Sequence, residues 1–135
     1  MRIDDLETPA LVVDLDVMDR NIQRYQDYFD QHGIGNRPHI KTHKIPAIAH
    51  KQLEAGARGI TCQKLGEVEV MANAGIDDIL LYYNVIGAAK LERLIRLSKR
   101  CDLKVTVDHP MVAEGISQAA SQAGVEIGVL AEMGS

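Results

Sequence analysis

Three basic residues occupy alternate positions in one short segment of the chain, Arg37, His39 and Lys41. If this segment is a β-strand, the three side chains lie on one face of it. Three cations on one face repel one another and are costly to desolvate, and an anionic ligand would relieve both effects. The deprotonated amine of a lysine also attacks carbonyl carbon. A phosphate-bearing aldehyde is therefore a ligand that this face could bind through Lys41.

Polar residues stand at the end of each strand that the sequence predicts. We expect strands at about residues 36–41, 59–63, 78–84, 103–108 and 125–132, which end in Lys41, Gln63, Asn84, Asp108 and Glu132. The opposite faces of these strands are apolar and include Ile40, Ile60, Ile79, Val105 and Ile127. Parallel strands bring their carboxyl ends to one edge of a sheet, where α/β proteins bind ligands. The five polar residues are therefore expected to form one rim, with helices covering the apolar face.

Each of these residues also has an ordinary structural interpretation. Lys41 could simply reach solvent from a strand end, as most lysines do, and Asp108 could cap the helix that begins at Pro110. His39 and His43 are four residues apart, a spacing that suits a metal pair on a helix. On a strand end and its following loop this spacing does not converge, so a role in orienting a cofactor is the better interpretation for either histidine.

Helical patterns alternate with the predicted strands. Apolar spacing predicts a helix capped by Asp16 and ended by Gly33, and a second helix from Pro46 to Gly56. Three more are expected around residues 65–72, around residues 91–95 and from Pro110 onward, and Glu67 and Glu69 are expected on an exposed helical face. The alternation indicates an α/β fold with a parallel sheet. A separate early strand is expected at about residues 10–14.

Composition excludes several classes of protein. Of the 135 residues, 46% are hydrophobic and 25% charged, which is typical of a globular domain. The net charge of −4 argues against a nucleic-acid partner. No apolar run approaches the roughly 20 residues of a membrane helix, and the acidic N-terminus does not resemble a signal peptide. The two cysteines, Cys62 and Cys101, are expected to be buried, which favours a reduced, cytoplasmic protein.

Three segments carry more specific motifs: TPALVVD at residues 8–14, RPHIKTHK at 37–44 and TCQKLGEVEVMA at 61–72. Together they resemble the D-threonine aldolase and D-serine dehydratase family, a branch of the alanine-racemase-like (fold-type III) pyridoxal phosphate enzymes. The segments GIDDILL at 75–81 and VDHP at 107–110 extend the resemblance over essentially the whole chain. The run at 37–44 is the most specific of them.

The resemblance implies that Lys41 is the Schiff-base lysine for pyridoxal phosphate, which supplies the electron sink for bond cleavage at Cα. It implies a lyase that acts on D-3-hydroxy amino acids by retro-aldol cleavage, as D-threonine aldolase does. A D-serine dehydratase, or a non-catalytic pyridoxal phosphate-binding protein of cofactor homeostasis, remains an alternative. The expected further cofactor contacts, in falling order, are His39, Arg37, Gln63, Asn84 and Asp108.

The length of the chain accommodates only part of a barrel. A complete β/α barrel takes about 250 residues, whereas these 135 residues provide about five barrel strands. We therefore interpret residues 1–135 as the N-terminal part of an alanine-racemase-type barrel, with the strand at about 10–14 belonging to a C-terminal β domain. The family also uses a divalent metal, whose ligands are not expected in this chain. The isolated chain is expected to be inactive and to form homo-oligomers or associate through unpaired strand edges.

Overall fold

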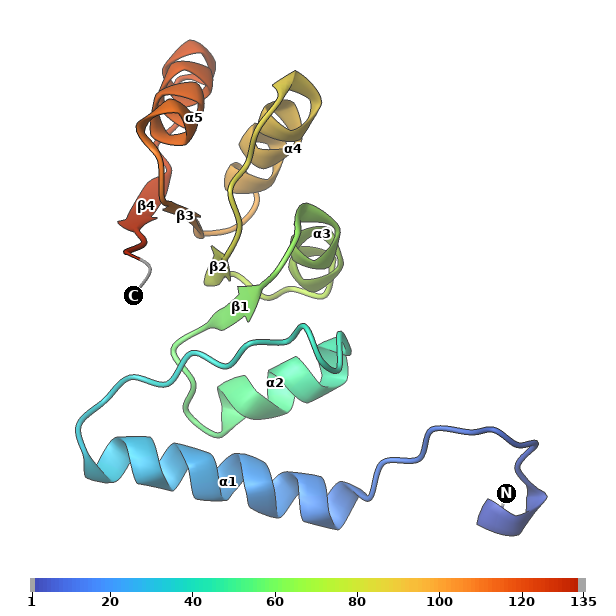
Figure 1. Cartoon of the computed structure of the whole chain (residues 1–135). Coiled ribbons are helices and arrows are strands. Elements are labelled where there is room, and N and C mark those ends of the chain that lie inside the picture. The colour runs from blue at the N-terminus through green and yellow to red at the C-terminus, as the bar shows by residue number, and fades with distance from the viewer. Residues whose placement is uncertain (1, 134–135) are drawn as a thin grey trace.

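A computed structural model of the chain describes residues 2–133. Strands and helices alternate along most of the chain, as the sequence predicts (Figure 1). The elements are η1 (Ile3–Asp5), α1 (Leu15–Gln31), α2 (Pro46–Glu54), β1 (Ile60–Cys62), α3 (Leu65–Asn73), β2 (Ile79–Leu81), α4 (Ala88–Ser98), β3 (Leu103–Val107), α5 (Pro110–Ala123) and β4 (Gly128–Ala131). Within residues 2–133, no helix combines the length and apolar character needed to cross a bilayer.

The strands form one parallel sheet in the order β1-β2-β3-β4. The segment before β1 joins this sheet through a single parallel bridge between His39 and Thr61. Two backbone hydrogen bonds support the bridge, from Ile40 N–H to the Thr61 carbonyl at 2.9 Å and from Thr61 N–H to the Pro38 carbonyl at 2.8 Å. Strands that follow one another in chain order, each connected through a helix, are the arrangement of a β/α barrel wall. The predicted α/β class and parallel sheet are confirmed.

Helices α3, α4 and α5 lie on one side of the strands (Figure 1). The predicted apolar face is the one they cover: Ile40, Ile60, Ile79 and Val105 are 0% exposed, and Ile127 packs against this core. Burial of one such side chain stabilises the fold by about 1.5–3 kcal/mol. A register shift of one residue would turn these side chains to the other face, so their burial fixes which side chains point inward.

Two of the expected strands are not formed as predicted. Residues 40–43 make a turn, so Lys41 lies in the turn after the His39 bridge and not at a strand end. Residues 10–14 are exposed and have no regular secondary structure, so the expected strand is not formed within residues 2–133. The cap of α1 is Asp14, not Asp16, because the Asp14 carboxylate accepts the Val17 N–H at 3.0 Å.

Candidate functional site at the carboxyl edge of the sheet

Lys41 occupies a tight turn at the carboxyl edge of the sheet. The turn is closed by Lys44 N–H, which donates to the Ile40 carbonyl at 2.8 Å. Lys41 N–H donates to Nδ1 of His39 at 3.2 Å, while its side chain is exposed. Among residues 2–133, the Lys41 ammonium has neither an ion-pair partner nor a hydrogen-bond acceptor. The backbone of Lys41 is therefore fixed while its amine stays accessible.

His39 links this turn to the neighbouring strand. Its Nδ1 atom accepts a hydrogen bond from Lys41 N–H, so that nitrogen carries no proton. Nε2 then carries the proton and donates to the Gln63 side-chain oxygen at 3.1 Å. The Gln63 amide in turn donates to the Tyr82 carbonyl at 3.0 Å. These contacts orient the His39 ring and connect the Lys41 turn with the residues that follow β1 and β2.

The other predicted rim residues also meet in pairs. Asn84 donates to the Asp108 carboxylate at 2.7 Å, joining the residues after β2 and β3. The Tyr82 hydroxyl donates to Glu132, the residue after β4, and this hydrogen bond raises the pKa of Tyr82. Asp108 does not cap α5, because the cap is His109, whose Nδ1 accepts Met111 N–H at 3.2 Å.

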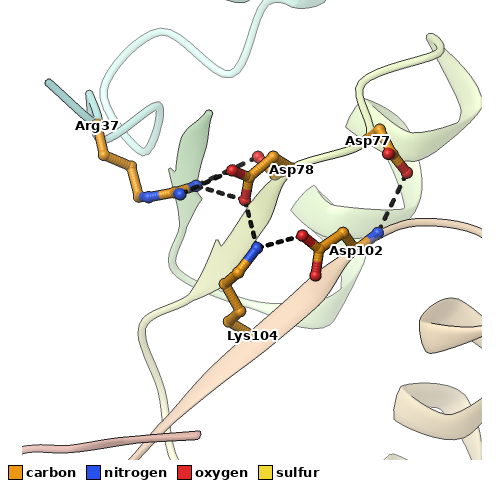
Figure 2. A network of polar contacts seen from close by, with 5 residues as sticks. All are labelled: Arg37, Asp77, Asp78, Asp102 and Lys104. Atoms are coloured by element: carbon orange, nitrogen blue, oxygen red, sulfur yellow. Dashed lines mark hydrogen bonds and ion pairs between the residues drawn. The ribbon is translucent and has the colours of Figure 1, made fainter. Parts of the chain in front are cut away.

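Arg37 lies apart from these residues, at the amino edge of the sheet (Figure 2). Its guanidinium makes two hydrogen bonds of 2.9 Å to the carboxylate of Asp78, which immediately precedes β2. Lys104 donates to the same carboxylate at 2.8 Å and also pairs with Asp102. The expected crowding of three cations was therefore wrong, because Arg37 is neutralised by Asp78 at the other edge of the sheet. Among the described residues, Arg37 is paired with Asp78, whereas the Lys41 ammonium has no ion-pair partner.

Glu67 was wrongly expected on an exposed helical face. Its side chain is only 6% exposed and accepts the Gln63 N–H at 2.8 Å. The ammonium of Lys44 lies 3.7 Å from its other carboxylate oxygen. A signal was present in the sequence, because a glutamate in the first turn of a helix commonly accepts a backbone N–H near the cap. Glu69 is half-buried and pairs with Arg93 at 2.8 Å.

His43 is held within the same loop. Its Nδ1 atom accepts Ile45 N–H at 3.1 Å, and its buried Nε2 atom has no hydrogen-bond partner among the described residues. Burial lowers the pKa of His43. Within residues 2–133, no three histidine, cysteine or acidic side chains are grouped as metal ligands would be.

Comparison with known proteins identifies the family. Residues 13–134 match the family described as "Alanine racemase, N-terminal domain". This chain therefore belongs to the alanine racemase N-terminal domain family, as the motifs and the parallel sheet had indicated.

The chain is similar to enzymes of D-amino acid metabolism. It is 43% identical over 128 residues to the D-threonine aldolase of Arthrobacter sp, covering 95% of this chain and 34% of that protein. It is 42% identical over 120 residues to the D-threo-3-hydroxyaspartate dehydratase of Delftia sp. (strain HT23), covering 88% and 31%. The crystal structure of D-threonine aldolase from Filomicrobium marinum matches with a TM-score of 0.95 at 43% identity, over 98% of this chain and 36% of that one. The chain thus spans about a third of the length of these relatives.

Proposed function

We propose that this chain carries the cofactor lysine of a pyridoxal phosphate-dependent lyase that acts on D-3-hydroxy amino acids, with Lys41 as the Schiff-base lysine. The observation that carries the proposal is the position of Lys41. Its amine is exposed and unpaired among the described residues, at the edge where parallel α/β proteins bind ligands. The similarity to a D-threonine aldolase over 95% of the chain supports the same assignment.

The residues around Lys41 fit the aldehyde end of this cofactor. The cofactor supplies an electron sink for the bond that is broken at Cα of the amino acid. The exposed amine of Lys41 would hold it covalently, and His39 and Gln63, which are hydrogen-bonded to each other at 3.1 Å, would orient it. Asn84 and Asp108 are candidates for further contacts from the same rim. We do not include Arg37, because its guanidinium is bound to Asp78 at the other edge of the sheet.

Retro-aldol cleavage is the reaction we propose first, and loss of water is the second candidate. The similarity to an aldolase, 43%, and to a dehydratase, 42%, is nearly equal. A D-serine dehydratase activity and non-catalytic storage of the cofactor both require the same lysine. The rest of the catalytic machinery would come from parts equivalent to the two thirds of the relatives that this chain does not span. We therefore expect little or no turnover of D-threonine by these 135 residues alone.

Two further inferences concern the surroundings of the protein. Cys62 and Cys101 are both free and buried, which supports a reducing compartment such as the cytoplasm.

The exposed residues 10–14 include apolar side chains, Leu11 among them at 97% exposure. Their exposure supports our proposal that this segment packs against a further domain.

Reductive trapping tests the assignment of Lys41. The chain is mixed with a small excess of pyridoxal phosphate and reduced with borohydride, and the labelled lysine is identified by peptide mass spectrometry. We expect Lys41 to carry most of the label and the variant Lys41→Ala to lose it. The variant Lys64→Ala, which changes an exposed lysine at the start of α3, is the matched control and should leave the label on Lys41. Equal labelling of the surface lysines, or a label chiefly on Lys44, would contradict the proposal.

A further inference from the structure

The turn that carries Lys41 ends in an unusual backbone conformation. Lys44 has a φ of 55°, in the left-handed region that side chains other than glycine and asparagine rarely adopt. A glycine at this position would avoid the strain. The one charged contact of the Lys44 side chain among the described residues is with Glu67.

Glu67 connects the two segments that form the candidate site. A carboxylate that is only 6% exposed requires partners, because burial of an unpaired charge is costly. One partner is the backbone N–H of Gln63 at 2.8 Å, and Gln63 holds His39. The other is the ammonium of Lys44 at 3.7 Å, at the end of the Lys41 turn. One buried carboxylate thus fixes both the residue after β1 and the turn beside it.

The ion pair also distinguishes two neighbouring lysines. Lys41 and Lys44 lie in the same turn, and both are exposed to solvent. The Lys44 ammonium is drawn toward Glu67 on α3, whereas the Lys41 amine has no such partner among the described residues. An amine that is engaged as a charged partner is a poor nucleophile for an aldehyde.

We propose that Glu67 is a positioning residue: it anchors the Lys41 turn through Lys44 and Gln63 and leaves Lys41 as the amine that reacts with the cofactor aldehyde. This inference rests on the proposed function for the identity of the reactive lysine, but the anchoring of the turn can be measured without any cofactor.

Glu67→Gln isolates the charge. The glutamine oxygen still accepts the Gln63 N–H, so the local hydrogen bond is kept and only the ion pair with Lys44 is removed. The matched control is Glu69→Gln, two residues further along α3, where the lost partner is Arg93 and not the Lys41 turn. Lys44→Gln removes the same ion pair by changing its exposed partner, and this variant replaces Glu67→Gln in the test if Glu67→Gln does not fold. Lys44→Arg restores a cation at that position.

Two measurements test the inference. The first is hydrogen exchange of the turn amides of Lys44 and Ile45, which are hydrogen-bonded in the structure. We expect Glu67→Gln and Lys44→Gln to speed their exchange about fivefold, the effect of losing one partly exposed ion pair, with Glu69→Gln and Lys44→Arg unchanged. The second is the distribution of the borohydride-trapped label between Lys41 and Lys44 in wild type and Glu67→Gln. We expect the variant to shift the label toward Lys44 by a similar factor.

The outcomes separate this inference from the proposed function. If wild type is labelled on Lys41, and the exchange rates and label distribution of Glu67→Gln equal those of Glu69→Gln, Glu67 does not position the turn and Lys41 keeps its assignment. If wild type is not labelled on Lys41, the proposed function fails, and the exchange rates alone then decide whether Glu67 anchors the turn.

Discussion

Replacement of Asp78 by asparagine removes the charge at the centre of the amino-edge network (Figure 2). The carboxylate accepts two hydrogen bonds from Arg37 at 2.9 Å and one from Lys104 at 2.8 Å. The variant keeps one oxygen that can accept from Arg37, and Lys104 keeps its contact with Asp102. The substitution therefore removes the equivalent of about two charge-assisted hydrogen bonds.

The expected loss of stability depends on how far the side chains of Arg37 and Asp78 are shielded from solvent. A hydrogen bond to a charged group contributes about 1.5–3 kcal/mol when it is buried. The side chains of Arg37 and Asp78 are 24% and 32% exposed, so solvent screening reduces each contribution by about half. We therefore expect Asp78→Asn to lower the free energy of unfolding by about 2 kcal/mol at pH 7.

The destabilisation caused by Asp78→Asn should become smaller at low pH. Burial raises the pKa of the Asp78 carboxyl, but the hydrogen bonds from Arg37 and Lys104 outweigh it and hold the pKa below its usual value of 3.8. A lowered folded-state pKa means that the stabilisation is present in full above the unfolded-state value and is lost as the pH falls through the folded-state value. The difference in unfolding free energy between wild type and Asp78→Asn should therefore shrink as the pH falls below 3.8.

Urea unfolding followed by circular dichroism at pH 7, 5, 4 and 3 measures this difference. Glu92→Gln is the matched control, because it removes an exposed i,i+4 ion pair with Arg96 and should cost less than about 0.5 kcal/mol at every pH. If Asp78→Asn behaves like this control at pH 7, or costs the same at pH 3 as at pH 7, the network does not stabilise the fold in the way we argue.

Two further predictions concern close packing and the sheet edge. A Cβ atom at Gly59 would lie 2.5 Å from the Asp78 carbonyl oxygen, whereas one at Gly66 would meet nothing within 4 Å. We therefore expect Gly59→Ala to lower the free energy of unfolding by about 1–3 kcal/mol, and Gly66→Ala to be at least as stable as wild type. Thermal unfolding measures both variants. All four residues of β4 are exposed, and among residues 2–133 this strand is paired on one side only. Sedimentation velocity should show concentration-dependent association that Val129→Lys reduces; a wild-type chain that stays monomeric at high concentration would contradict this.

The buried face of each strand could be predicted from the sequence, because the burial of apolar side chains determines which face turns toward the helices. Ile60 is followed by Thr61 and Val105 is flanked by Lys104 and Thr106, and only one register buries both together with Ile79. The parallel topology follows from the helices between the strands, and those helices begin at residues with clear local signals, such as Pro46 and Pro110.

The details around Lys41 were not predictable from alternation alone. The pattern of Arg37, His39 and Lys41 indicated a continuous strand, but Lys41 lies in a turn closed by Lys44 N–H. The partner of Arg37 is set by a tertiary contact. Arg37 pairs with Asp78, which is forty-one residues further along the chain, and no local sequence pattern indicates a partner at that separation. Glu67 carried a local signal in its position in the first turn of α3, but its ion pair with the distant Lys44 did not.

Lys41 differs from the paired cations at the two edges of the sheet, and this difference bears on the proposed site. At the amino edge, the cations of Arg37 and Lys104 each meet a carboxylate of the same chain. At the carboxyl edge, the ammonium of Lys44 lies 3.7 Å from Glu67, whereas the ammonium of Lys41 has no partner among the described residues. Pairing within the chain is therefore available to this fold and is used where a cation serves stability. An accessible, unpaired amine at the edge that binds ligands in related architectures is consistent with reaction with a partner from outside the chain, and an anionic aldehyde meets both its charge and its chemistry.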